Sequence, residues 1–368
     1  MRVRPSKKSE LNARAFVLFC GGALLCASYG LGRQIAWNAP AFTPDQFSQI
    51  KDAVSDATLA STPNREDQFI APSSPNPLPQ EAWNGLTLRL NQMAARYHGR
   101  VAIYLQNLKN GQTWAYHPND LFPAASLIKV PIMISVFERI HEGDLSLTQT
   151  MTLRRHNRVG GSGTLKWKPD GTRLTISQLL DHMIRESDNT AANMLIEAVG
   201  GIPYVQSQLP KVGLVYTGIH RQGMSLRSGH VARENYTTAK EMALMLRKIY
   251  DGKMIDPASS RLMLDYLLLK KPEASRLGKG LPWGWEIAHK TGLERRACHD
   301  AAIILTPHGD FLLTVLTGSN PSYRPAKNFI TKIGRLTYRY YGGHITVHSR
   351  RYYAVAGKTR RRRSHRRL

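Results

Sequence analysis

The sequence predicts an α/β fold of the α+β type: an antiparallel sheet flanked by helices, with a separate block of helices between its strands. Two observations predict it. Apolar runs of strand length occur at residues 100–118 and again at residues 285–318. Between them, apolar residues recur at helical spacing. A sheet completed from both sides of a helical block is typical of layered α+β domains.

The early elements are a helix and a hairpin. "GLTLRLNQMAARYHG" at residues 85–99 repeats its apolar residues at helical spacing, so the folded domain should begin near Trp83. Two strand-like runs then flank the turn "KNG" at residues 109–111, which is a hairpin signal.

The central helices carry recognisable start signals. One helix should run from Ser126 to about Glu142, and another covers "LTISQLLDHMIRES" at residues 174–187. Two of the later starts match the capping box, and a third pairs an acidic N-cap with proline in the first turn. The expected cap residues are Thr175 with Gln178, Thr238 with Glu241, and Asp256 with Pro257.

The late elements are three strands and a final helix. "WEIAHKTG", "DAAIILTP" and "DFLLTVLTG" are strand-like runs within residues 285–318. A helix should follow at residues 326–342. The hairpin near residue 110 and these three strands would complete one sheet.

Charge is concentrated at the two ends of the chain. The 368 residues carry a net charge of +25 with 42% hydrophobic residues, a balance that suits a globular core with basic termini. Residues 346–368 are expected to form a disordered basic tail. Such a tail can contact anionic polymers of the cell envelope, and no nucleic-acid partner is expected.

The first residues have the layout of an export segment. A basic stretch precedes the apolar run at residues 15–32, so residues 1–33 should be a signal peptide or a single membrane anchor, and both alternatives stay open. Residues 34–82 are rich in proline and serine and should form an extended tether. The folded domain should then cover residues 83–345 and be exported to the periplasm or cell envelope, either secreted or anchored in the inner membrane.

Ser126 and Lys129 form the first candidate for chemistry. They stand one helical turn apart, so an amine lies within reach of a hydroxyl. Pro131 is tolerated only in the first turn of a helix, which places the helix start close to Ser126. The hydroxyl would then lie at the positive end of the helix dipole. Taken alone, this spacing also fits an ordinary surface lysine.

Two further motifs follow in the chain. Ser187-Asp188-Asn189 falls between two predicted helices, where Ser187 or Asp188 could simply cap the second helix. Lys290-Thr291-Gly292 falls on a predicted strand, where the lysine could protect a sheet edge.

The ordered set Ser-x-x-Lys, Ser-Asp-Asn, Lys-Thr-Gly resembles that of class A β-lactamases and penicillin-binding-protein-like serine hydrolases. The resemblance covers residues 84–342 and implies a two-lobe fold with an all-helical lobe. It implies that the enzyme acts through a serine acyl-enzyme on β-lactam or cell-wall peptide amides. The implied catalytic residues are Ser126, Lys129 and Ser187; the implied substrate-binding residues are Asn189, Lys290, Thr291, Gly292 and Leu293.

The resemblance also implies individual roles. Ser126 would attack a carbonyl, and Lys129 would take its proton. Ser187 would pass a proton to the leaving nitrogen, and Lys290 with Thr291 would bind the substrate carboxylate. The backbone N–H groups of Ser126 and Leu293 would form the oxyanion hole.

One family residue is missing. The glutamate that activates the deacylating water in class A β-lactamases falls near Gln222, and the only acid between Gly200 and Tyr236 is Glu234. An amide cannot accept a proton at neutral pH, so deacylation should be slow. Glu234 should instead pair with Arg221 or Arg233, or remain a surface acid.

Two alternative functions stay open. One is a D-Ala-D-Ala peptidase or esterase-type hydrolase of the envelope, and the other is a non-catalytic domain that binds or senses peptidoglycan. No zinc-ligand spacing or phosphate loop is convincing, so no metal or cofactor is expected. Cys298 should be a small buried side chain, and the histidines His289, His299 and His308 should be core or surface residues.

Overall fold

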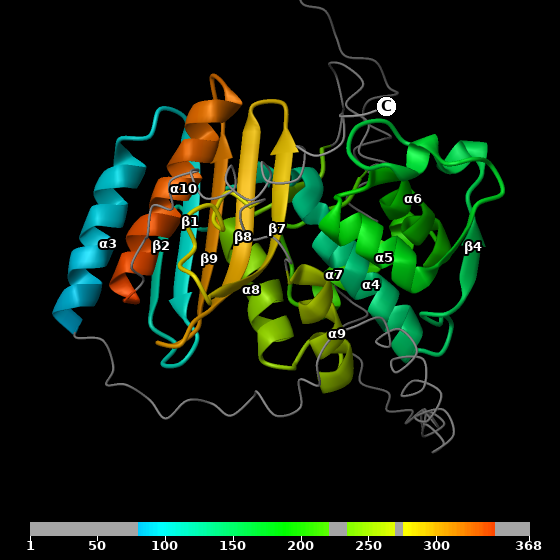
Figure 1. Cartoon of the computed structure of the whole chain (residues 1–368), viewed down its shortest axis with the longest axis horizontal. Coiled ribbons are helices and arrows are strands. Elements are labelled where there is room, and N and C mark those ends of the chain that lie inside the picture. Colours follow the sequence, from blue (N-terminus) through cyan, green and yellow to red (C-terminus); the bar gives the residue numbers. More distant parts are fainter. Residues whose placement is uncertain (1–79, 221–233, 269–274, 343–368) are drawn as a thin grey trace, which may run out of the picture. The chain divides into compact units, whose positions relative to one another are not determined.

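The computed structural model describes residues 80–220, 234–268 and 275–342. Its centre is a five-stranded antiparallel sheet in the order β2-β1-β9-β8-β7 (Figure 1). β1 pairs with β9, so strands from the two ends of the domain meet in the middle of the sheet, which confirms the predicted fold class. The strands are β1 (Arg100–Asn107), β2 (Thr113–Tyr116), β7 (Glu286–Glu294), β8 (Ala297–Leu305) and β9 (Phe311–Gly318).

Two helices cover one face of this sheet. α3 (Gln80–Ala95) and α10 (Tyr323–Tyr340) lie side by side and pack against the strands (Figure 1). Their apolar stripes and the strand side chains on that face form one core cluster, which includes Leu90, Ile330 and Tyr338. Burial of such a continuous apolar layer is the main stabilising term of the lobe.

The other face of the sheet meets the helical block. α8 (Ala239–Tyr250) packs on the central strands, and α4 (Lys129–His141) lies in the middle of the remaining helices (Figure 1). Residues 130–137 of α4 are all buried, so the helix that follows Ser126 has no solvent face over two turns. The other helices are α5 (Ile176–Arg185), α6 (Asn189–Ala198), α7 (Ile202–Lys211) and α9 (Pro257–Leu267).

Short elements join these layers. β3 (Phe122–Pro123) pairs with β6 (Tyr236–Thr237), and β4 (Thr150–Thr152) pairs with β5 (Arg173–Thr175). Three 3-10 turns are η1 (Ala125–Ile128), η2 (Arg155–Asn157) and η3 (Leu165–Trp167). β3 leads directly into η1, so the small β3–β6 ladder fixes the chain just before Ser126.

The predicted caps are confirmed at two helices and only half confirmed at the third. Thr175 and Gln178 form the reciprocal capping box of α5, and Asp256 caps α9. Thr238 accepts the N–H of Glu241, but the carboxylate of Glu241 does not return to the cap. Instead it accepts three backbone N–H groups from residues 215–217, at 2.6, 2.8 and 2.6 Å. Three charge-assisted bonds outweigh the single bond that a capping box offers.

The chain outside these ranges includes several predicted segments. α3 begins at Gln80, three residues inside the segment predicted as a tether, because Gln80 and Glu81 extend its first turn. The export segment at residues 1–33, residues 34–79 of the tether and the basic tail at residues 346–368 lie outside the described residues. Among the helices within the described ranges, none is long and apolar enough to cross a membrane.

Candidate active site

Ser126 lies on η1, and η1 ends directly before Lys129, the first residue of α4. Pro131 is the third residue of α4, so the helix starts where the sequence predicted, after one turn of 3-10 geometry. The preceding Ala125 has φ +46°, a left-handed conformation that is costly for a residue with a Cβ atom. The turn is held from outside, since the N–H of Ala124 donates to the carbonyl of Asn235 at 2.7 Å.

Lys129 is fully buried, and its amine has four oxygen neighbours. Nζ lies 2.6 Å from the carbonyl of Ser187 and 2.7 Å from Oδ1 of Asn189. It lies 3.2 Å from Oγ of Ser126 and 3.2 Å from Oγ of Ser187. The two short contacts are to oxygens that can only accept. The two long contacts are to hydroxyls that can also donate.

This pattern fits a neutral amine. A neutral amine has two N–H donors, which the two carbonyl oxygens satisfy, and one lone pair. The lone pair is left facing the hydroxyls, where it can accept the proton of Ser126. Burial lowers the pKa of Lys129 well below its usual value, and the nearby charge of Lys290 lowers it further. Electrostatics and hydrogen bonding therefore favour the same protonation state.

Ser187 lies in the turn between α5 and α6, also with a left-handed φ of +55°. Its Oγ lies 3.2 Å from Nζ of Lys129 and 3.0 Å from Nζ of Lys290. The hydroxyl therefore bridges the two amines. Asn189 holds the turn from the other side, since its Nδ2 donates to the carbonyl of Gly160 at 2.8 Å.

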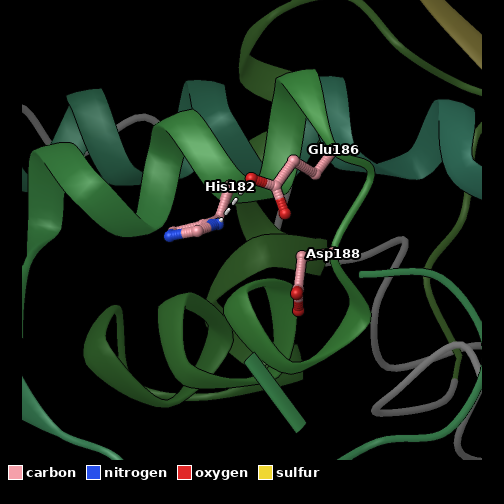
Figure 2. Close-up of side chains that lie close together, drawn as sticks. All are labelled: His182, Glu186 and Asp188. Carbon is pink, nitrogen blue, oxygen red and sulfur yellow. Dashed lines mark ion pairs between the residues drawn. The ribbon is translucent and has the colours of Figure 1, made fainter. Parts of the chain in front are cut away.

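Asp188 is buried and structural. One carboxylate oxygen accepts the N–H of Ala191 and caps α6, and the other accepts the N–H of Leu165 at 2.8 Å. His182, Glu186 and Asp188 have potential ligand atoms within 4.8 Å of one another. Figure 2 shows that His182 and Glu186 form an ion pair along α5, while the carboxylate of Asp188 points away from it. Because both Asp188 oxygens already accept backbone bonds, we interpret the group as an ion pair beside a helix cap.

Lys290 lies on β7, at an edge of the sheet. Its side chain is buried, and burial together with the charge of Arg276 lowers its pKa to about 7. Thr291 is half-buried, and Leu293 is 42% exposed at the end of the same strand.

Gly292 lies against the turn that carries Ser126. A Cβ atom at this position would lie 3.3 Å from the carbonyl of Ala124 and 3.3 Å from Cβ of Ala125. The absence of a side chain thus lets β7 approach the nucleophile turn. The structure therefore brings all eight predicted site residues to the junction of η1, the α5–α6 turn and β7. Gln222, Arg221 and Arg233, which bear on the missing glutamate, lie outside the described residues.

Two buried polar residues lie behind this junction: Asp300, which sequence reasoning missed, and His299, which it expected only as a core or surface residue. Asp300 is fully buried on β8 and accepts bonds from the Oγ of Ser275, from the N–H groups of Arg276 and Leu277, and from the ring of His289. The neighbouring His299 is also fully buried and contacts the nucleophile turn. Their only sequence signal is a polar pair inside the apolar run "ACHDAAIIL", which is unusual for a buried strand.

Comparison with known proteins decides the family. Residues 85–341 match the model of the beta-lactamase enzyme family. The chain belongs to this family. The shared fold and catalytic type agree with the geometry above: the protein is a serine hydrolase of the β-lactamase type, as predicted.

Individual relatives are distant but extensive. β-Lactamase VEB-1 of Pseudomonas aeruginosa is 24% identical over 271 residues, which cover 70% of this chain and 91% of VEB-1. The crystal structure of a β-lactamase from Sphaerobacter thermophilus is 29% identical, with a TM-score of 0.65, and covers 71% of this chain and 98% of that one. A mutant of PBP-A, solved as an acyl-enzyme complex with penicillin G, is 26% identical with a TM-score of 0.65; the match covers 70% and 97% of the two chains.

Proposed function

We propose that β-lactams acylate this enzyme at Ser126 and that the acyl-enzyme is hydrolysed slowly. The observation that carries the acylation step is the buried amine of Lys129, which lies 3.2 Å from the Ser126 hydroxyl and whose pKa is lowered by burial and by the charge of Lys290. A β-lactamase-family relative, the PBP-A mutant, forms an acyl-enzyme with penicillin G. The same chemistry would accept a cell-wall peptide amide as acyl donor.

The acylation step uses the arrangement as follows. Lys129 takes the proton of Ser126 as Oγ attacks the carbonyl carbon, and the carbonyl oxygen becomes an oxyanion. The N–H groups of Ser126 and Leu293 stabilise that oxyanion. Ser187, 3.2 Å from Nζ of Lys129, relays the proton to the departing nitrogen. The ammonium group of Lys290 and the hydroxyl of Thr291 bind the substrate carboxylate.

Slow deacylation follows from the groups available to a water molecule. Within the described ranges, no carboxylate hydrogen-bonds to Ser126 Oγ or Lys129 Nζ. By the family resemblance, the position of the glutamate falls near Gln222, whose amide cannot act as a base. Loss of a general base typically costs about a hundredfold to ten-thousandfold in rate.

Intact-protein mass spectrometry tests the acylation. Full-length protein incubated with penicillin G should gain the mass of one penicillin, localised to Ser126 by peptide mapping, and Ser126→Ala should gain none. Absence of any adduct with penicillin, cephalosporin and peptide donors would favour a non-catalytic binding domain. Digestion of muropeptides by the purified enzyme would instead favour the peptidase.

Steady-state kinetics tests the deacylation. A burst of product equal to the enzyme concentration should precede a slow phase, and Gln222→Glu should accelerate that slow phase about a hundredfold or more. Glu234→Gln is the matched control and should leave it unchanged. Fast, sustained penicillin hydrolysis by the wild-type enzyme would contradict the proposed missing base.

We further propose that the enzyme is exported to the cell envelope. The apolar run at residues 15–32 follows a basic stretch, and residues 346–368 are strongly basic. Cell fractionation and N-terminal sequencing would distinguish a cleaved signal from a retained anchor, and recovery in the cytoplasmic fraction would contradict export.

A further inference from the structure

His299 lies between the two parts of the active site that the sequence left unconnected. On β8 it pairs with Gly292 of β7 on one side and with Leu316 of β9 on the other. Its side chain is fully buried and lies edge-on to the ring of Phe122, with centroids 6.1 Å apart. The imidazole is therefore enclosed by the sheet and by the segment that leads to Ser126.

Both ring nitrogens of His299 are used. Nδ1 lies 3.2 Å from the backbone nitrogen of Thr317, and Nε2 lies 2.8 Å from the carbonyl oxygen of Pro123. The N–H of Thr317 can only donate, so Nδ1 must accept. The carbonyl of Pro123 can only accept, so Nε2 must carry the proton. These partners define a neutral imidazole with its proton on Nε2.

The ring lies against the chain just before Ser126 and just before Leu293, the two residues assigned to the oxyanion hole. Pro123 stands three residues before Ser126, across the left-handed Ala125. On the other side, a Cβ atom added at Gly292 would lie 2.9 Å from Cδ2 of His299, so the ring packs closely against the strand that continues into Leu293. One rigid side chain therefore packs beside Gly292, where β7 meets the nucleophile turn, and also hydrogen-bonds to the segment that leads into that turn.

We propose that His299 is a positioning residue that sets the distance between the oxyanion-hole N–H groups of Ser126 and Leu293. The ring supports Gly292 from the neighbouring strand, and its Nε2–H bond to Pro123 holds the segment before the strained turn, so both sides of the contact are fixed to one side chain. Burial of the ring also lowers the pKa of His299 to about 4, which agrees with the neutral form that the contacts require. No atom of His299 needs to touch the substrate for this role.

The role predicts a loss in the chemical step with little loss in binding. In the full-length enzyme, His299→Ala should lower the acylation rate constant about a hundredfold, comparable to the loss of one oxyanion-hole donor. The dissociation constant of the initial complex should change less than about threefold. His299→Gln places an amide N–H near the position of Nε2 and should recover at least about tenfold. Stopped-flow acylation with a chromogenic cephalosporin at several concentrations separates the two constants.

A matched control separates positioning from stability. Ile330→Ala removes buried side-chain atoms from the core on the opposite face of the sheet and should lower the melting temperature without slowing acylation. If His299 had only a structural role, His299→Ala would lose acylation only in proportion to the loss of folded protein. Its folded fraction would then react at the wild-type rate, as is expected for Ile330→Ala. Acylation by His299→Ala within about threefold of wild type, or no recovery in His299→Gln, overturns the proposal.

This inference rests on the proposed acylation of Ser126. If wild-type protein gains no penicillin adduct, the proposed function and this inference both fail. If wild type is acylated and His299→Ala reacts equally fast, only the inference fails. The imidazole itself gives an independent readout, because nitrogen NMR of the free enzyme should show the tautomer with the proton on Nε2, and the other tautomer would overturn the assignment.

Discussion

At the scale of single residues, the decisive feature is a buried lysine whose pKa is lowered, which favours its neutral form. The amine of Lys129 donates hydrogen bonds to two oxygens that can only accept, and its nitrogen also contacts the hydroxyl of Ser126. Burial alone makes the ammonium form costly, and a second amine nearby adds repulsion. Burial and the neighbouring amine thus favour the neutral form of Lys129, which can act as a base.

Replacing that amine tests its role. Lys129→Met removes the base and keeps the chain length, and Lys129→Arg keeps a cation that cannot lose its proton. Both should lower the acylation rate about a hundredfold to ten-thousandfold. Burst kinetics with a chromogenic β-lactam measures the effect. Near-normal acylation by the arginine variant would show that Lys129 acts as a charge and not as a base.

Lys290 should make substrate binding depend on pH. Its pKa is lowered to about 7, so the ammonium form is lost as the pH rises through neutrality. We expect kcat/KM for acylation by a carboxylate-bearing β-lactam to fall above about pH 7 in a pH-rate profile. The effect on stability has the opposite sign, because between pH 7 and 10.5 the unfolded chain binds the proton more tightly, so stability should rise with pH across that window. Lys290→Met should remove the fall in kcat/KM and reduce the rise in stability, to which buried Lys129 still contributes.

Much of the site could be predicted because the ordered set of three short motifs resembles that of a known family, although each motif alone also fits an ordinary surface or capping residue. Ser126 and Lys129 share one turn, and Ser187 falls where one cap ends and another begins. Asp300 and His299 could not be predicted in this way, since their partners lie 11 to 176 residues away in the chain. Glu241 matched a capping pattern, but a loop distant in sequence offered its carboxylate more donors.

At the scale of elements, the loop at residues 275–278 is secured to the sheet by one buried acid. Asp300→Ala should lower the free energy of unfolding by about 3 kcal/mol, because it leaves several buried donors without an acceptor. Hydrogen exchange at residues 275–278 should accelerate. Asp120→Ala is the control, since its pair with Arg100 is exposed and should contribute at most about 1 kcal/mol. Equal effects of the two variants in denaturant melts would contradict the anchoring role.

At the scale of the whole molecule, the sheet joins distant parts of the chain. β1 is hydrogen-bonded along its length to β9. α10 packs beside α3, and the two helices cover one face of the sheet. The fold class could be predicted because strand runs at both ends leave few other ways to bury their apolar faces. The order of the strands could not be predicted, since no local feature specifies that β9 lies between β1 and β8.

This arrangement predicts very different effects of two truncations. Ending the chain after Ser322 removes α10, including Ile330, Ile333 and Tyr338, and exposes the apolar residues of the sheet and α3 that pack against them, so the product should not fold. Removing residues 346–368 should leave the melting temperature and the acylation rate unchanged. Thermal unfolding and penicillin labelling measure both. A stable, acylated product of the first truncation would show that the sheet folds without its covering helix.

Ala125 and Ser187, two left-handed residues at the active site, have a consequence for attempts to improve the enzyme. Each stores local strain of about 1–3 kcal/mol. A laboratory selection for heat resistance alone should therefore enrich glycine at both places, since glycine adopts that geometry freely. Glycine in place of Ser187 would remove the hydroxyl that bridges the two lysines. Glycine in place of Ala125 would make the backbone beside the nucleophile more flexible.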